Sequence, residues 1–292
     1  MRPHIWIVAL GLWIAGLLIG SWAERDPQSE PMFANGYRVI AADLHVHAYP
    51  GDGVLPPWEI AREARRQRLD AVALTNHNQM LPVRLAALVP FASPALLIPG
   101  EEVTTPGYHM AAIGLRYPID WHHSAAEAAS EIHAQGGAAI AAHPGRIAWP
   151  AFDRPALVAI DGAEAAHPGM DFKGNNREDY AAFFERARSV KPTIAAIGST
   201  DFHDLAPLGQ CRTYLFVRDL TVPDIVDAVR AGRTVACDAH GRTYGNPSLA
   251  RIVAARCERD ALSDPTSVAD RAGVVCALGG LVLLIVAGGR RM

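Results

Sequence analysis

The chain has 292 residues, of which 50% are hydrophobic, and its formal net charge is −3. This length suffices for one large domain or two small ones with a substantial buried core. The small net charge and the lack of a long run of Lys and Arg argue against a nucleic-acid partner. The four Cys form no Cys-x-x-Cys pair, which argues against a zinc site made of thiolates.

An apolar run from Ile5 to about Gly20 opens the chain. It is about as long as a bilayer span and longer than the apolar region of most signal peptides. The small residues of Ser21-Trp22-Ala23 resemble a signal-peptidase site. Residues 1–23 are therefore expected to be a signal peptide or a membrane anchor, because no polar stripe marks them as a buried core helix. Residues 24–36 read as a linker.

From Tyr37 onward, β-rich runs alternate with segments of helical spacing. Strands are expected at residues 38–44, 71–75, 96–99, 102–104, 108–115, 138–142, 159–165, 193–198 and 213–217, and helices at 56–68, 82–89, 124–135, 177–190 and 223–231. Ser124 and Glu127 form a capping box at one helix start. The alternation predicts a parallel sheet, and the number of units predicts an α/β fold with a distorted (β/α)7-type barrel over residues 37–258. The weakly periodic residues 238–271 are expected to hold a closing strand and a tether, 259–271.

A second apolar run, Ala272 to Gly288, lies near the end of the chain and is closed by Arg290 and Arg291. Residues 272–289 are thus expected to form a transmembrane helix. Basic residues stay on the cytoplasmic side of a membrane. Arg2 precedes the first apolar run, and Arg290 and Arg291 follow the second, so both ends of the chain are expected on that side. The sequence therefore predicts a membrane-anchored chain whose folded domain faces the non-cytoplasmic side, periplasmic or extracellular.

Three of the four Cys lie between the apolar runs, an odd number for an oxidising compartment. A bridge between Cys211 and Cys237 is one alternative. Three buried free thiols, with Cys257 as the third, are the preferred interpretation.

Side chains that bind metals gather just past the predicted strands. His45 and His47 end the first strand two residues apart, so both point to one face of it. The others that follow strand ends are His77, Glu102, His143, His167, Asp201 and His203. In α/β barrels the active site forms at the carboxyl ends of the strands, so one site is expected to collect this set. Imidazole and carboxylate without thiolate suit Mn, Fe or Zn, and the set is too large for one ion, which predicts two or three divalent metal ions.

Short motifs with these residues follow one another along the chain. They are Asp43-Leu44-His45-Val46-His47, Gly51-Asp52-Gly53, Thr75-Asn76-His77, Pro99-Gly100-Glu101-Glu102-Val103, Ala142-His143-Pro144-Gly145, Glu164-Ala165-Ala166-His167-Pro168 and Gly198-Ser199-Thr200-Asp201-Phe202-His203. Their order resembles the PHP-domain metallohydrolases, the polymerase and histidinol phosphatase superfamily, over about residues 37–235. The resemblance adds Asp52 to the metal ligands and selects Glu102 over Glu101. It also implies catalytic roles for three of the ligands: Asp201, His143 and His167.

Two residues depart from the pattern of that family. Asn76 stands where relatives have Asp, which removes a carboxylate that would orient a neighbouring group. Asp52 stands where some members have His, which makes the site harder and favours Mn or Fe over Zn. The closing motif also has one residue more than usual.

Two further residues are candidates for binding a substrate or cofactor. Arg146, three residues after His143, suits phosphate oxygens, with a surface Arg as the alternative. His109 either lines the pocket or faces the core. Phosphate-specific sites usually show more than one cation near the metals, and only Arg146 and Lys173 are well placed for this.

Most characterised relatives act on phosphate esters, so the resemblance implies a phosphoesterase that attacks a small-molecule ester with a metal-bridging hydroxide. One alternative is a carboxylic or carbamate ester hydrolase with the same site, because residues 99–105 resemble a hydrolase branch that includes carbamate-ester hydrolases. Another alternative is a non-catalytic metal-binding domain, against which the nearly full ligand set argues.

Overall fold

Strands form the centre of the chain, as its alternating pattern predicts. The structure is a computed structural model, and it describes residues 4–23, 31–89, 94–169, 177–204, 207–262 and 268–289. The chain divides into two compact units, here called the terminal unit (residues 1–28 and 263–292) and the barrel unit (residues 29–262).

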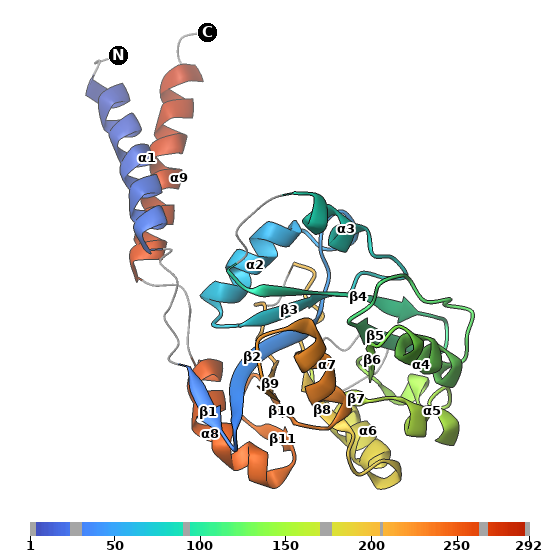
Figure 1. Cartoon of the computed structure of the whole chain (residues 1–292). Coiled ribbons are helices and arrows are strands. Elements are labelled where there is room, and N and C mark those ends of the chain that lie inside the picture. Colours follow the sequence, from blue (N-terminus) through green and yellow to red (C-terminus); the bar gives the residue numbers. More distant parts are fainter. Residues whose placement is uncertain are drawn as a thin grey trace. The chain divides into compact units, whose positions relative to one another are not determined.

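A mixed sheet curls into a nearly closed barrel in the barrel unit (Figure 1). Its strands are β1 (Met32–Ala34), β2 (Tyr37–Val46), β3 (Ala71–Leu74), β4 (Leu96–Thr104), β5 (His109–Ile113), β6 (Ala138–Ala141), β7 (Gly162–Ala166), β8 (Ala195–Gly198), β9 (Arg212–Val217), β10 (Thr234–Cys237) and β11 (Thr243–Gly245). They follow the order β11-β10-β9-β2-β3-β4-β5-β6-β7-β8, with β1 paired to β2. β8 also packs beside β10, which brings the two ends of the sheet together.

The directions of the strands correct the prediction of a parallel sheet. β2, β3 and β4 are parallel to one another, as are β6, β7 and β8. β5 runs antiparallel to both β4 and β6, and β9 runs antiparallel to both β2 and β10. Only four residues join β4 to β5, which allows a hairpin and not the crossover that a parallel pair needs. The α/β barrel is confirmed, but it is a mixed one.

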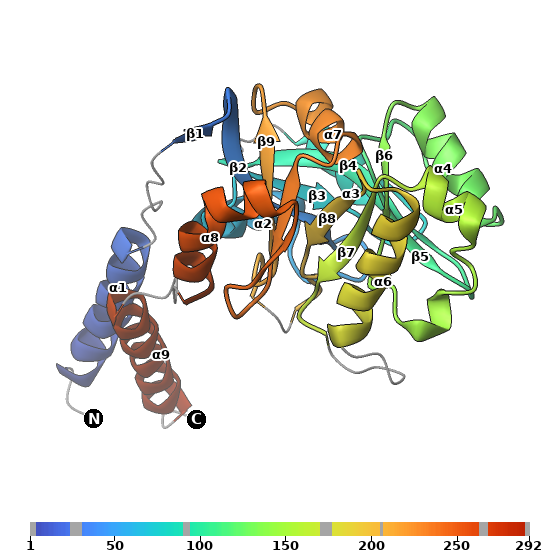
Figure 2. The same cartoon turned by 90° about the horizontal axis from the view of Figure 1, so that it is seen from below.

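Helices pack against this sheet (Figure 2). They are α2 (Pro57–Arg66), α3 (Leu81–Leu88), α4 (Ala125–Ala134), α5 (Arg154–Ala159), α6 (Arg177–Val190), α7 (Val222–Arg230) and α8 (Pro247–Leu262), with a short 3-10 helix, η1 (Arg146–Ala148), before α5. The predicted capping box is present at α4, where Ser124 Oγ accepts the Glu127 amide and the Glu127 carboxylate accepts the Ser124 amide at 2.9 Å. The strand expected at 159–165 begins later, because Ala159 is the last residue of α5. Asp153 caps this helix by accepting the Ala156 amide at 3.0 Å.

One hydrophobic cluster fills the inside of the barrel. It draws small and β-branched side chains from β2 to β6, β8 and β9, together with one face of α7. Two other clusters lie between the opposite faces of the strands and the remaining helices, one with α4, α5 and α6 and the other with α2 and α8. A single interior cluster shared by seven strands of the curled sheet fits a nearly closed barrel.

Helix α8 and one disulfide depart from the sequence-based predictions. α8 runs to Leu262, past the predicted domain end at 258, and β1 lies within the predicted linker. Neither was predicted, because both segments show weak periodicity. Cys237 at the end of β10 is bonded to Cys257 of α8, with the Cα atoms 5.8 Å apart. The alternative bridge to Cys211 and the three free thiols were therefore both wrong, and Cys211 is buried and takes part in no disulfide among the described residues.

The terminal unit consists of two helices, α1 (His4–Ala23) and α9 (Val268–Gly289), that pack closely on each other. A Cβ added at Gly16 would collide with the backbone of α9 at Ala277, so only Gly fits there. Among the described residues, no helix is long and apolar enough to cross a membrane. The two predicted membrane spans thus find no support among the described residues. Arg2, Arg290 and Arg291 lie outside the described residues. The location of the domain stays a prediction.

Candidate metal centre

The predicted site residues come together at one end of the barrel, where β2, β3, β4, β7 and β8 end. Because β5 is antiparallel to β4, its first residue, His109, lies at this same end. Ligand-type side chains form three groups of neighbouring atoms here, each able to hold an ion. These groups contain His45, His47, Asp52, His77, Glu102, His109, Asp201 and His203.

The first group lies on the side of β2, where His45, His47 and Glu102 are buried and the Asp201 side chain is 23% exposed. The Nε2 atoms of His45 and His47 lie 3.2 Å apart, and each lies 3.1–3.5 Å from Glu102 Oε2 and Asp201 Oδ1. Neither of these two carboxylate oxygens has a hydrogen-bond partner among the described residues. Buried polar atoms are normally satisfied, and four lone-pair atoms that face one point fit a divalent ion.

The second group uses Asp52, whose Oδ2 lies 3.2 Å from Nε2 of both His77 and His203. His47 borders this group, with its Nδ1 3.0 Å from Asp52 Oδ1, while its Nε2 faces the first group. Asn76 donates to the same Oδ1 at 3.0 Å and to Ala48 O at 2.8 Å. Asn76, which departs from the pattern of the motifs, therefore orients Asp52: its amide binds Oδ1 and leaves Oδ2 facing His77 and His203.

The third group joins His77 and His109 around Glu102. His109 Nδ1 lies 2.7 Å from Glu102 Oε1, and His143 Nε2 lies 3.0 Å from the same oxygen. Glu102 Oε2 faces the first group and also lies 2.6 Å from His77 Nδ1, so one carboxylate belongs to two of the three groups. A bridging carboxylate of this kind is what a site with more than one metal ion needs.

His143, His167 and Arg146 lie outside the three groups. His167 Nε2 is 3.9 Å from Asp201 Oδ2, while its Nδ1 accepts the Gly169 amide at 3.1 Å. Arg146 donates from Nε to Asp179 at 2.6 Å, and its guanidinium lies 4.6 Å from the centre of the Trp149 ring. Its positive charge is thus already paired. Lys173 falls outside the described residues.

Two buried carboxylates that the motifs did not single out support the ligands. Glu164 of β7 accepts His45 Nδ1–H at 2.8 Å and the Ser199 hydroxyl at 2.5 Å. This fixes the tautomer of His45 and leaves Nε2 free for an ion. A lone Glu in the Ala-rich strand of residues 163–166 is the signal that could have found it.

Asp43, at the other end of the first motif, holds the loop that follows β8. It accepts the amides of Thr200 at 3.1 Å and Gly209 at 3.0 Å, as well as the Thr200 hydroxyl. Thr200 precedes Asp201, which has a φ of 49°, in the left-handed region that costs energy for a residue other than Gly. Asp43 thus helps to keep Asp201 in a strained conformation.

The metal-free site retains protons on its imidazoles. Burial disfavours a charged His45, but the neighbouring carboxylates, Asp201 foremost, outweigh it and raise the pKa of His45 well above its usual value. Burial also opposes a charge on His47, yet the adjacent carboxylates of Asp201, Asp52 and Glu102 raise its pKa to about 10. Despite their burial, Glu102 and Asp201 have pKa values well below the usual range because of these imidazoles. Positive charge is therefore favoured where the ligand atoms converge.

No protein-family model and no curated protein matches the sequence. Solved structures do match. A two-domain protein from Bacteroides vulgatus ATCC 8482, described as containing a predicted PHP-like metal-dependent phosphoesterase, has a TM-score of 0.61 at 21% identity, over 78% of this chain and 73% of that one. This likeness shows a shared fold.

Two further structures match more weakly. One is a candidate metal-dependent phosphoesterase from Bifidobacterium adolescentis ATCC 15703, with a TM-score of 0.46 at 17% identity over 64% of this chain and 94% of that one. The other is an amidohydrolase from Chromobacterium violaceum with bound sulfate and no metal, with a TM-score of 0.45 at 16% identity over 77% and 98%.

Proposed function

We propose that this chain is a metal-dependent hydrolase and that its substrates are small phosphate esters. The observation that carries the proposal is the buried Glu102, which belongs to two of the candidate ion groups. Beside it lies Asp201 Oδ1, which has no hydrogen-bond partner among the described residues. Divalent ions held there would lower the pKa of water and stabilise the charge that develops on the oxygens of a phosphate ester. The PHP-like fold supports the same class of reaction.

The protein's own residues would hold and orient the reacting groups. Glu164 keeps His45 Nε2 directed at the first position, and Asn76 keeps Asp52 Oδ2 directed at the second. Burial lowers the pKa of His167 to about 4, so this imidazole is neutral near pH 7. Its Nδ1 accepts a backbone amide, so the hydrogen resides on Nε2, which is buried and has no hydrogen-bond partner among the described residues. His167 is therefore suited to donate a hydrogen bond to a substrate oxygen.

One observation favours the alternative substrate class. Phosphate-specific sites usually add cationic side chains to the metal ions, and Arg146 already pairs with Asp179 at 2.6 Å. A carboxylic or carbamate ester carries less negative charge and has less need of such a cation. The same metal site would serve that reaction.

A comparison of ester substrates tests the proposed function. The full-length protein, reconstituted with Mn²⁺, is expected to hydrolyse p-nitrophenyl phosphate or bis-p-nitrophenyl phosphate much faster than p-nitrophenyl acetate or a p-nitrophenyl carbamate. Each rate should be lost in EDTA and return with metal. A preference for the acetate or carbamate would establish the alternative class, and no turnover of any of them would favour a non-catalytic metal-binding domain.

The number of bound ions is a separate prediction. Because the ligand atoms form three groups and exceed the shell of a single ion, the protein should retain at least two transition-metal ions per chain. Elemental analysis after reconstitution with Mn²⁺, Fe²⁺ or Zn²⁺ and desalting measures this number. A content of one ion or fewer with every metal would refute the multinuclear site.

A further inference from the structure

A chain of buried polar contacts joins helix α8 to the loop of residues 199–204, here called the ligand loop because it carries Asp201 and His203. The contact nearest the site is Asp43, which accepts the amides of Thr200 and Gly209. Gly209 has a φ of 70°, and a Cβ there would press on the Leu69 side chain at 2.8 Å. This peptide is therefore closely fitted, and its orientation decides whether its N–H reaches Asp43.

The carbonyl side of the same glycine is held by Arg212, the first residue of β9. Arg212 Nε donates to Gly209 O at 2.9 Å, and Nη1 donates to Gln67 O at 2.9 Å, just after α2. The Arg212 residue is only 4% exposed. A guanidinium presents several donors in one rigid plane, so a single side chain can bind two carbonyls and still face a carboxylate.

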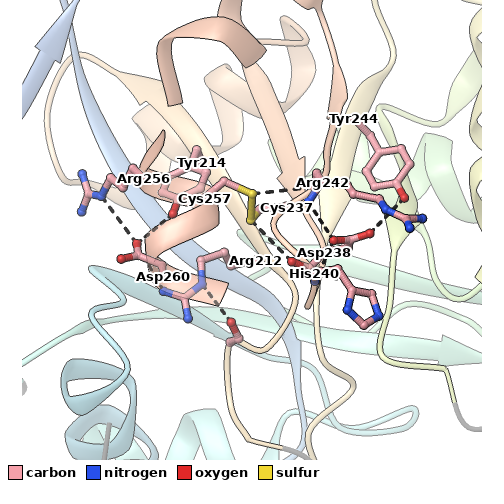
Figure 3. Close-up of a disulfide and its surroundings, with 11 residues drawn as sticks. Arg212, Tyr214, Cys237, Asp238, His240, Arg242, Tyr244, Arg256, Cys257 and Asp260 are labelled. Atoms are coloured by element: carbon pink, nitrogen blue, oxygen red, sulfur yellow. Dashed lines mark hydrogen bonds and ion pairs between the residues drawn. A yellow bond between two sulfur atoms is a disulfide. The ribbon is translucent and has the colours of Figure 1, made fainter. Parts of the chain in front are cut away.

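That carboxylate is Asp260 of α8, shown with its neighbours in Figure 3. Its Oδ2 lies 3.7 Å from Arg212 Nη1 and from Arg256 Nε, and it accepts the Tyr214 hydroxyl at 2.8 Å. Cys257, one helical turn earlier, carries the disulfide to β10. Covalent and ionic contacts thus fix the same face of α8 to the barrel and set the position of Asp260.

We propose that Arg212, oriented by Asp260, is a positioning residue for the ligand loop and raises the affinity of the centre for metal ions. It contacts none of the candidate ligands. It acts by holding the Gly209 carbonyl. The N–H of the same residue, in the preceding peptide group, binds Asp43, which in turn holds Thr200 beside Asp201. The inference rests on the proposed metal centre and not on the choice of substrate.

Arg256 offers a matched control. Both guanidiniums are buried, and each lies 3.7 Å from the same oxygen of Asp260. They differ in their other contacts: Arg256 lies over the Tyr214 ring at 5.7 Å, whereas Arg212 binds the Gly209 carbonyl. Arg212→Met and Arg256→Met therefore remove the same charge from the same cluster. Only the first of them removes the contact with Gly209.

The experiment measures Mn²⁺ affinity by calorimetry in the full-length protein, together with thermal melting in EDTA. Loss of a partner hydrogen-bonded to a metal ligand typically weakens metal binding about 10–100-fold. The lower end, about tenfold, is expected for a residue that acts through Gly209 and Asp43. Arg212→Met should show a loss of that size. Arg256→Met should lower the melting temperature and leave the affinity for Mn²⁺ close to that of the wild type.

Two results would overturn the inference: wild-type affinity in Arg212→Met, or an equal loss of affinity in Arg256→Met, which would mean that any loosening of α8 weakens the site. If Arg212→Met does not fold, Arg212→Lys and Asp260→Asn are measured in its place. Each should bind Mn²⁺ more weakly than Arg256→Met. Wild-type affinity for Mn²⁺ in both variants would overturn the inference. Binding is measured without substrate, so a failure of the proposed phosphoesterase activity leaves this comparison intact.

Discussion

Glu102→Gln is expected to abolish turnover and to lower the ion content to one or none. Both oxygens of Glu102 are needed as charged ligands, because Oε2 faces His45 and His47 while Oε1 faces His109 and His143. An amide presents one oxygen and one NH₂ group, so it cannot bridge two ions. The rate should fall by about three orders of magnitude or more. The measurement is metal content by elemental analysis, with hydrolysis of the best ester from the substrate comparison.

The neighbouring residue provides the control for this change. Glu101 lies on the other face of β4, where its carboxylate accepts the Ile119 amide and burial raises its pKa to about 7. Glu101→Gln keeps an oxygen for that amide, so metal content and rate should stay near the wild-type values. Equal losses in the two variants would mean that β4 tolerates no change here, and normal activity in Glu102→Gln would exclude Glu102 as the shared ligand.

Much of this arrangement could be predicted from the sequence, because the ligands follow strand ends. His45 and His47 share one face of β2 and lie together, as their spacing predicts. His77 and Glu102, 25 residues apart in the numbering, form an isolated bridge at the ends of neighbouring strands. The shared end of a barrel thus collects residues that are distant in sequence, and the α/β fold could be inferred with them.

Other features could not be predicted because they depend on strand direction or on tertiary pairing. The position of His109 follows from the antiparallel direction of β5, which the run of β-formers does not reveal. Glu164 reads as one residue of a strand, and its role depends on His45, which lies 119 residues earlier. The partner of Cys237 depends on α8, whose sequence has weak helical periodicity.

The protons on the imidazoles give the metal centre a pH dependence of known sign. The pKa of His47 is raised to about 10 in the metal-free protein, so near neutral pH this ring is protonated. An ion binds only the neutral ring, and each ion must therefore displace a proton. Rising pH removes the competing proton, so the affinity should increase with pH up to the raised pKa. Without metal, the contribution of His47 to stability is complete below its unfolded pKa of about 6.5 and is lost as pH rises toward 10.

The apparent affinity for Mn²⁺ should therefore rise about 100-fold between pH 6 and pH 8, because displacing one proton changes the binding constant about tenfold per pH unit. Calorimetry in two buffers of different ionisation enthalpy measures the affinity and counts the protons released per ion. Thermal melting adds an independent comparison: the metal-free protein should lose stability from pH 7 to pH 10, and the metal-loaded protein should lose less, since its His45 and His47 are held as neutral ligands. An affinity that is flat or falls over this range, with no proton released, would show that these imidazoles do not bind the ions.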